Sequence, residues 1–148
     1  MTPPEESRIP DHQPFHFRIR IGVTGRRNLS TDEGLIDAIK SVLAHIERHV
    51  STCRHIALQW EASSCLADGA DRIVAKEILR GPEARLKAII PLSISDYEET
   101  FGLDSEGRPL SSNAVEESRR EFREMMNDRR TRTICLRERM VSSEAIET

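Results

Sequence analysis

One stretch of the chain, residues 15–30, restricts the fold more than any other. Its apolar side chains alternate with polar ones, and they belong to Phe15, Phe17, Ile19, Ile21 and Val23. Alternation with a period of two predicts a β-strand. The strand leads into a turn that contains Gly25, Arg26 and Arg27, and a helix is expected directly afterwards. A helix that begins after such a turn offers unpaired backbone N–H groups and the positive end of its dipole. The stretch therefore predicts a strand, an anion-binding turn and a helix.

The residues after this turn predict a first helix from about residue 31 to residue 49. Ser30 and Glu33 have the spacing of a capping box, in which each side chain bonds to the backbone of the other residue. Apolar residues then recur at helical spacing, at Leu35, Ile36, Ile39, Val42, Leu43, Ile46 and Val50. We expect this stripe to pack on a sheet.

The rest of the chain repeats the alternation of strands and helices. The expected elements are a strand at 56–62, a helix from residue 70 to Gly81-Pro82, a strand at 86–92, a helical turn at 96–101, an exposed loop at 102–112, a helix at about 113–129 and a strand at 131–136. Strands that alternate with helices pair in parallel through right-handed crossovers. We therefore expect an α/β fold, a Rossmann-like three-layer domain with a mainly parallel sheet. This domain covers residues 15–136, between a flexible, proline-rich leader (1–14) and a tail (137–148) without clear periodicity.

Composition narrows the class of protein. A chain of 148 residues suits one domain, and no apolar stretch approaches the ~20 residues that a membrane-spanning helix needs. The polar, acidic start does not have the pattern of a signal peptide. Three cysteines without a Cys-x-x-Cys pair argue against a disulfide framework. We expect a cytoplasmic protein with no membrane partner, and the net charge of −3 disfavours nucleic acid without excluding it.

Two polar loops are expected to form a ligand site. Ligands of open parallel sheets bind beyond the carboxyl ends of the strands, and residues 22–30 and 63–71 follow the first two strands. Glycines allow close approach of the backbone, hydroxyls offer hydrogen bonds and arginines offer charge. The residues concerned are Gly22, Thr24, Gly25, Arg26, Arg27, Ser63, Ser64 and Gly69. The first loop has neither a complete Gly-x-Gly-x-x-Gly pattern nor a P-loop, so neither mechanism is assigned. The alternative is a tight turn with surface arginines.

Both loops, taken in order, resemble the SLOG superfamily, which includes the DNA-processing protein A (Smf) proteins and the lonely-guy phosphoribohydrolases. The matching stretches are Gly22-Val23-Thr24-Gly25-Arg26-Arg27-Asn28-Leu29, residues 64–75, Ile90-Pro91-Leu92 and the Tyr-x-x-x-Phe at 97–101. The resemblance covers residue 17 to about residue 136. It implies a Rossmann-like domain that binds nucleotides or nucleotide-derived ligands. It places Gly25 and Arg27 at the first-loop positions, and Ser64, Ala67, Gly69 and Asp71 at those of the second loop. Ala67 and Asp71 enter the predicted site on this ground alone.

The chain departs from the family pattern in two respects. Arg26 stands where this branch of the family usually has histidine, which removes a group that titrates near neutral pH. The family usually continues to a glycine-pair loop and, in the hydrolases, a catalytic glutamate, whereas this chain has no Gly-Gly. The domain is therefore expected to be truncated, a fragment or a degenerate member, and binding is favoured over catalysis. If the C-terminal half of the domain is missing, one edge of the sheet is exposed. A second copy of the chain can cover such an edge, so a homo-oligomer is an alternative.

Other clusters of reactive residues have simpler explanations. His45, His49 and Cys53 have a metal-like spacing, but no carboxylate or second cysteine completes the set, so no metal site is expected. Asp68 is expected to cap the second helix rather than to form an acid–base pair with Asp71. The acidic turn (Asp96, Glu98 and Glu99) is expected to be solvated. The arginines of residues 119–132 alternate with glutamates, which favours ion pairs on a helix surface.

Three functions follow from these patterns. The first is binding or sensing of a nucleotide or nucleotide-derived phosphorylated ligand at the carboxyl edge of the sheet. The second is hydrolysis of a nucleoside monophosphate by a phosphoribohydrolase, an N-glycosidase reaction. The third is single-stranded DNA binding of the DNA-processing type, which the net charge and the few aromatic residues make the least favoured. Neither a cofactor nor a catalytic residue is assigned.

Overall fold

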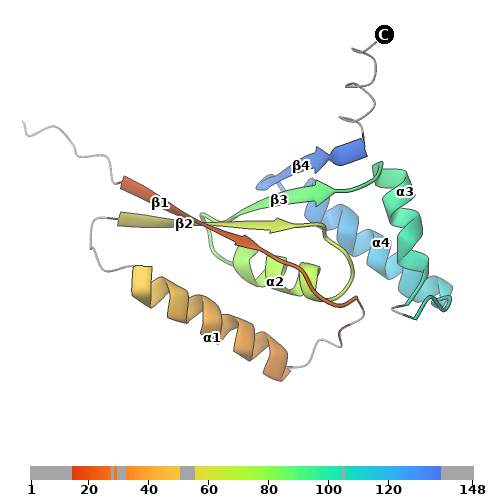
Figure 1. Cartoon of the computed structure of the whole chain (residues 1–148), viewed down its shortest axis with the longest axis horizontal. Helices are drawn as coiled ribbons and strands as arrows, with labels where there is room; N and C mark the ends of the chain where they lie inside the picture. Colours follow the sequence, from red (N-terminus) through yellow and green to blue (C-terminus); the bar gives the residue numbers. More distant parts are fainter. Residues whose placement is uncertain (1–14, 28, 30–32, 51–55, 105, 138–148) are drawn as a thin grey trace, which may run out of the picture.

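The computed structural model describes residues 15–27, 29, 33–50, 56–104 and 106–137 (Figure 1). Strands and helices alternate along these residues. In chain order they are β1 (Phe15–Gly22), α1 (Glu33–Val50), β2 (Ile56–Ser64), α2 (Ala70–Leu79), β3 (Arg85–Ile90), α3 (Ile94–Glu99), the 3₁₀ turn η1 (Thr100–Gly102), α4 (Ser112–Asn127) and β4 (Thr131–Cys135). The predicted leader (1–14) and residues 138–148 of the predicted tail lie outside the described residues.

The strands form one four-stranded sheet in the order β1-β2-β3-β4, and every neighbouring pair is parallel. Gly22 lies opposite Ser63, and Ser64 lies opposite Ala88, so the carboxyl ends of β1, β2 and β3 lie at the same edge of the sheet. The structure is α/β with a parallel sheet flanked by helices, which confirms the predicted fold class and is consistent with a Rossmann-like domain.

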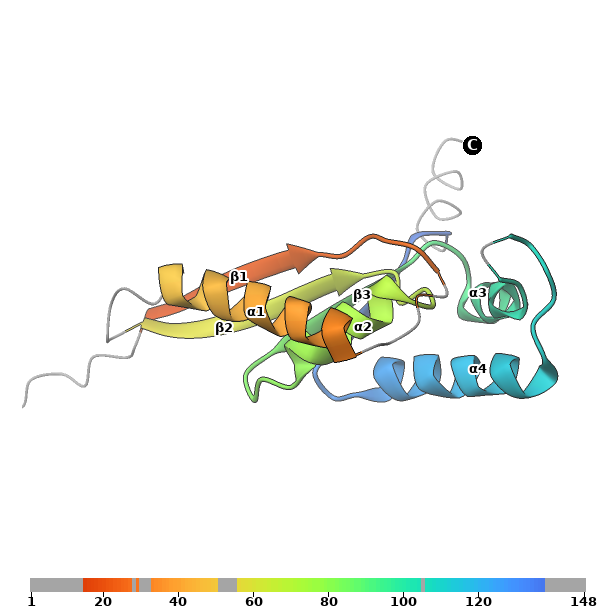
Figure 2. The same ribbon diagram turned by 90° about the horizontal axis from the view of Figure 1, so that it is seen from below.

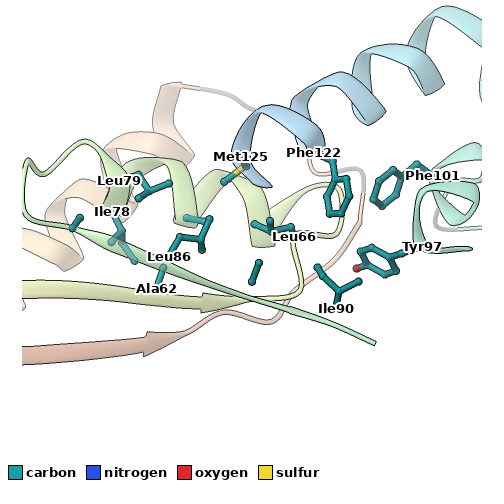
Figure 3. Packing of buried hydrophobic residues seen from close by; sticks show 13 residues of the cluster. Ala62, Leu66, Ile78, Leu79, Leu86, Ile90, Tyr97, Phe101, Phe122 and Met125 are labelled. Atoms are coloured by element: carbon teal, nitrogen blue, oxygen red, sulfur yellow. The ribbon is translucent and has the colours of Figure 1, made fainter. Parts of the chain in front are cut away.

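Helices α1, α2 and α4 pack against the same face of the sheet (Figures 1 and 3). On β3, Leu86, Ala88 and Ile90 are buried under these helices, whereas Arg85, Lys87 and Ile89 between them are more exposed. When successive strands are neighbours, right-handed crossovers place every connecting helix on one side. Of the three layers of a Rossmann-like fold, the described residues thus supply the sheet and the helices of one face.

The hydrophobic core lies between this face and helices α2 and α4 (Figure 3). At its carboxyl-edge end, Tyr97, Phe101 and Phe122 form an aromatic cluster with ring centroids 5.2–5.8 Å apart. Figure 2 shows α3 beyond the ends of the strands, beside α4. Helix α1 contributes less, since none of its residues is buried and Val42 on its apolar stripe is 59% exposed. The carboxyl edge is therefore closed on one side by aromatic residues.

Most element boundaries agree with the prediction to within two residues, and the differences have local causes. Helix α4 ends at Asn127 rather than 129 because Asp128 has extended backbone angles. Strand β3 ends at Ile90, and Ser93 then caps α3 by accepting a hydrogen bond from the Asp96 backbone. The predicted capping box lies partly outside the described residues, because Ser30 is not among them. Among the described helices, none combines the length and apolarity needed to cross a membrane.

Candidate functional site

The two predicted loops lie side by side at the carboxyl edge of the sheet. The backbone N–H of Val23 donates to the carbonyl of Ser63 at 3.0 Å, and the N–H of Ala70 donates to the carbonyl of Arg26 at 3.2 Å. Gly25 packs directly on the start of α2, since a Cβ atom at this position would lie 2.4 Å from the Cβ of Ala70. Residue 25 must therefore be glycine because the two loops are in contact there. The prediction gave a different reason, the close approach of a ligand to the backbone.

At the N-terminus of α2, one of the free backbone N–H groups is bonded within the protein. Gly69 is its N-cap residue, with φ of 85°, a conformation that favours glycine. The first N–H of the helix, on Ala70, is already bonded to Arg26. The prediction that Asp68 caps this helix is wrong. Its carboxylate instead pairs with Arg72 at 2.8 Å and accepts a hydrogen bond from the Ser118 hydroxyl, because α4 lies close enough to supply that partner.

Ser64 shapes the second loop from within. Its side chain is buried, and its hydroxyl oxygen accepts a hydrogen bond from the Leu66 backbone at 3.0 Å. Leu66 has φ of 57°, in the left-handed region that a leucine seldom adopts, and its side chain is fully buried. Burial of Leu66 and the bond from its N–H hold this strained turn in place. Ser64 is therefore part of the frame of the site rather than an exposed hydroxyl.

Asp71 lies beneath the same turn and is 6% exposed. Burial raises the pKa of its carboxyl, while hydrogen bonds from the backbone of Ala67 and Cys65 and the charge of Arg27 oppose that rise. The carboxylate thus connects residues 65–67 to α2. Ala67 contributes to the site through its backbone N–H, which bonds to this carboxylate. A buried carboxylate that accepts hydrogen bonds from the backbone of this loop is suited to holding it in place.

Arg27 and Tyr97 form a second wall of the site. A guanidinium nitrogen of Arg27 donates to the carbonyl of Thr100 at 3.2 Å and so connects the first loop to η1. Tyr97 is buried, its hydroxyl points toward the strands (Figure 3), and burial raises its pKa to about 12. Tyr97 belongs to the Tyr-x-x-x-Phe pattern at 97–101 but was not among the predicted site residues. This pattern is the sequence signal that could have identified Tyr97 as a residue of the site.

Arg72 was missed by sequence analysis, although it is the largest fully buried side chain among the described residues. Its Nε donates to the carbonyl of Leu66 at 2.8 Å, and one terminal nitrogen bonds to Ser118 and Glu121. Its guanidinium carbon lies 4.6 Å from the ring centroid of Phe101, a cation–π distance. The other terminal nitrogen is buried without a hydrogen-bond partner. Arg72 thus links α2, the second loop and α4.

The remaining predicted residues differ in exposure. Gly22, Thr24 and Arg26 are exposed, and nothing lies within 4 Å of a Cβ position on Gly22. Ser63 is half-buried, and its register opposite Lys87 places it on the sheet face that the helices do not cover. A cavity of about 350 Å³ opens beside the second loop, and Asp68, Gly69 and Arg72 are among its lining residues. The exposed groups available to a ligand are therefore concentrated on the first loop.

The described residues contain no group of three or more histidine, cysteine, aspartate or glutamate side chains arranged to hold a metal ion. The ring centroids of His45 and His49 lie 4.2 Å apart, and both side chains are on the exposed side of α1. Cys53, the third residue of the metal-like spacing, lies outside the described residues. The predicted ion pairs on α4 are present, between Arg120 and its neighbours Glu117 and Glu124.

No protein-family model matches this chain, and neither a curated protein nor a solved structure does.

Proposed function

We propose that this protein binds a nucleotide, or a phosphorylated molecule derived from one, at the carboxyl edge of its sheet. The observation that carries the proposal is the contact between Gly25 and Ala70, which seats the arginine-bearing loop on the N-terminus of α2. The Arg26 backbone lies at the N-terminus of α2, the positive end of the helix dipole, and its side chain is exposed. The helix N-terminus and the guanidinium of Arg26 both favour an anionic group.

The two arginines have different roles in this proposal. Arg26 is exposed and binds the phosphate through its guanidinium, since the first N–H of α2 is occupied by the Arg26 carbonyl. Arg27 is half-buried and bonded to Thr100, so it orders the loop and adds positive charge behind it. The exposed hydroxyl of Thr24 supplies a further hydrogen bond. Ser64, Gly69 and Asp71 maintain the shape of the second loop.

The burial of Asp71 favours binding over the hydrolase alternative. A phosphoribohydrolase needs a carboxylate that reaches the reacting bond, whereas Asp71 is 6% exposed and held by backbone N–H groups. The resemblance to the SLOG superfamily supports the choice of a nucleotide over other phosphorylated ligands. Single-stranded DNA binding is the third alternative, and it differs from the first in its requirement for several phosphates.

Isothermal titration calorimetry with AMP, ATP and ribose 5-phosphate tests the proposal. We expect at least one of these ligands to bind the wild type and to bind Arg26→Ala about tenfold more weakly, the usual size of a lost charge-assisted hydrogen bond. Arg120→Ala, which removes an exposed arginine of α4, is the matched control and should bind like the wild type. Absence of binding to all three ligands, or equal binding by Arg26→Ala, contradicts the proposal. Chromatography of the AMP samples detects free adenine, which would establish the hydrolase alternative instead.

A further inference from the structure

The sheet face opposite the helices is strongly cationic. Along it, the register places Arg20 opposite Glu61, Glu61 opposite Arg85, and Lys87 opposite Arg132. A cavity of about 590 Å³ lies on this face, and the cations among its lining residues are Arg18, Arg20, Arg85, Lys87, Arg129, Arg130 and Arg132. The chain as a whole carries a net charge of −3, so this concentration of positive charge is local.

Much of this charge is not neutralised within the fold. Glu61 pairs with Arg18 and Arg20, and Asp128 pairs with Arg130. Within the described part of the chain, Arg85, Lys87, Arg129 and Arg132 form no ion pair. Arg85, Arg129 and Arg132 are exposed, and Lys87 is half-buried. Four like charges on one face repel one another and lower the stability of the fold unless an anionic partner is present.

The face is also apolar at one end. Ile89 and Ile134 lie opposite each other on β3 and β4, two residues beyond Lys87 and Arg132, and both are half-buried. Sheets with only parallel strands are almost always covered on both faces, usually by helices. A face that combines isoleucines with unpaired cations therefore fits a covering segment that has both apolar and acidic residues.

The geometry points to an acidic amphipathic helix of a partner protein as the occupant of this face. Cations two residues apart on a strand are separated by ~6.6 Å, close to the ~6 Å between side chains four residues apart on a helix. A ridge of carboxylates on the partner helix thus pairs with Arg85 and Lys87 along β3. Arg132 lies opposite Lys87 on β4, beside this ridge. Apolar residues one or two turns along the same helix cover Ile89 and Ile134.

Two other occupants fit the face less well. A second copy of this face would bring cations against cations, which disfavours a face-to-face dimer. A single-stranded nucleic acid gains affinity from bases stacked on aromatic residues, and the described residues of this face include no phenylalanine, tyrosine or tryptophan. It would also leave the isoleucines without an apolar partner.

Fluorescence anisotropy with a labelled helical peptide tests the inference. The peptide carries glutamates at four-residue spacing followed by leucines on the same face, and a matched peptide has glutamine in place of each glutamate. We expect the full chain to bind the acidic peptide, and the doubly reversed variant Lys87→Glu/Arg132→Glu to bind it at least about tenfold more weakly. Lys40→Glu reverses an exposed charge on α1 and should leave the affinity nearly unchanged. Circular dichroism establishes that each variant is folded.

The inference is overturned if the acidic peptide does not bind, if the glutamine peptide binds equally well, or if the doubly reversed variant retains wild-type affinity. A labelled oligodeoxythymidine provides a separate arm. Tighter binding of this strand than of the acidic peptide, lost in the same variant, identifies the face as a nucleic-acid surface and also overturns the inference. None of the substituted residues belongs to the two loops of the proposed nucleotide site, so the two proposals succeed or fail independently.

Discussion

Gly25 packs so closely on Ala70 that a Cβ atom at residue 25 would lie 2.4 Å from the Ala70 Cβ. This contact joins the loop after β1 to the first turn of α2. It also explains the hydrogen bond from the Ala70 N–H to the Arg26 carbonyl, because the two backbones can approach only where a side chain is absent. The shape of the proposed nucleotide site therefore depends on this pair.

We expect Gly25→Ala to lower the free energy of unfolding by about 1–3 kcal/mol, because the added methyl group overpacks the contact. Urea denaturation measures this change. The double variant Gly25→Ala/Ala70→Gly moves the methyl group from one partner to the other and should recover much of the loss. Gly22→Ala is the control, since nothing lies within 4 Å of its Cβ position. A single variant as stable as the wild type would show that the loops do not need this contact.

We expect Arg72→Ala to lower the free energy of unfolding by about 3–5 kcal/mol, the usual cost of breaking a buried ion pair. The Arg72 side chain is 2% exposed, and its loss removes the ion-pair partner of Asp68 and the hydrogen-bond donor to the Leu66 carbonyl. Arg72→Lys keeps the charge but loses the planar group that bonds in several directions, so it should be intermediate in stability. Thermal denaturation followed by circular dichroism ranks the wild type and the two variants by stability. Equal stability of the lysine and arginine forms would contradict the proposed geometry.

Tyr97 is the only tyrosine in the chain, so its ionisation can be observed directly by ultraviolet difference spectroscopy. We expect a midpoint of about 12 in the folded protein, because burial raises the pKa from 10.0. The same titration in concentrated urea should give a midpoint near 10.0. Because the folded state holds the phenol proton more tightly, the contribution of Tyr97 to the free energy of unfolding is complete below pH 10 and is lost as the pH rises toward 12. A midpoint near 10.0 in the native protein would show that the hydroxyl is solvated.

Much of the fold could be predicted from local patterns. The alternation from Phe15 to Val23 predicted β1, and the apolar stripe from Leu35 to Val50 predicted α1. The class of fold followed from the order of these elements. The ends of helices were less certain, because α4 ends where the backbone of Asp128 becomes extended, and this depends on its bonds with Arg130.

The candidate site was predicted only in part. Glycine, serine and aspartate in loops 22–30 and 63–71 indicated a polar edge, and these loops do lie together. However, Ser64 and Asp71 face inward, and sequence patterns do not distinguish a side chain that binds a ligand from one that holds a turn. Arg72 was missed because its partners Ser118 and Glu121 lie on α4, more than forty residues later in the chain.

The sequence by itself determined which segments are strands and which are helices, because the spacing of apolar residues is a local property. It also determined that polar and cationic residues follow the first two strands. Only the tertiary structure decided the strand order β1-β2-β3-β4. With it came the contact of Gly25 with Ala70 and the packing of the described helices on one face of the sheet. These features arise from pairing between segments far apart in the chain. Arg72 of α2 is buried by contacts with α4, a helix far along the chain. The pairing of β3 with β4 places Lys87 opposite Arg132, on the face that the described helices do not cover.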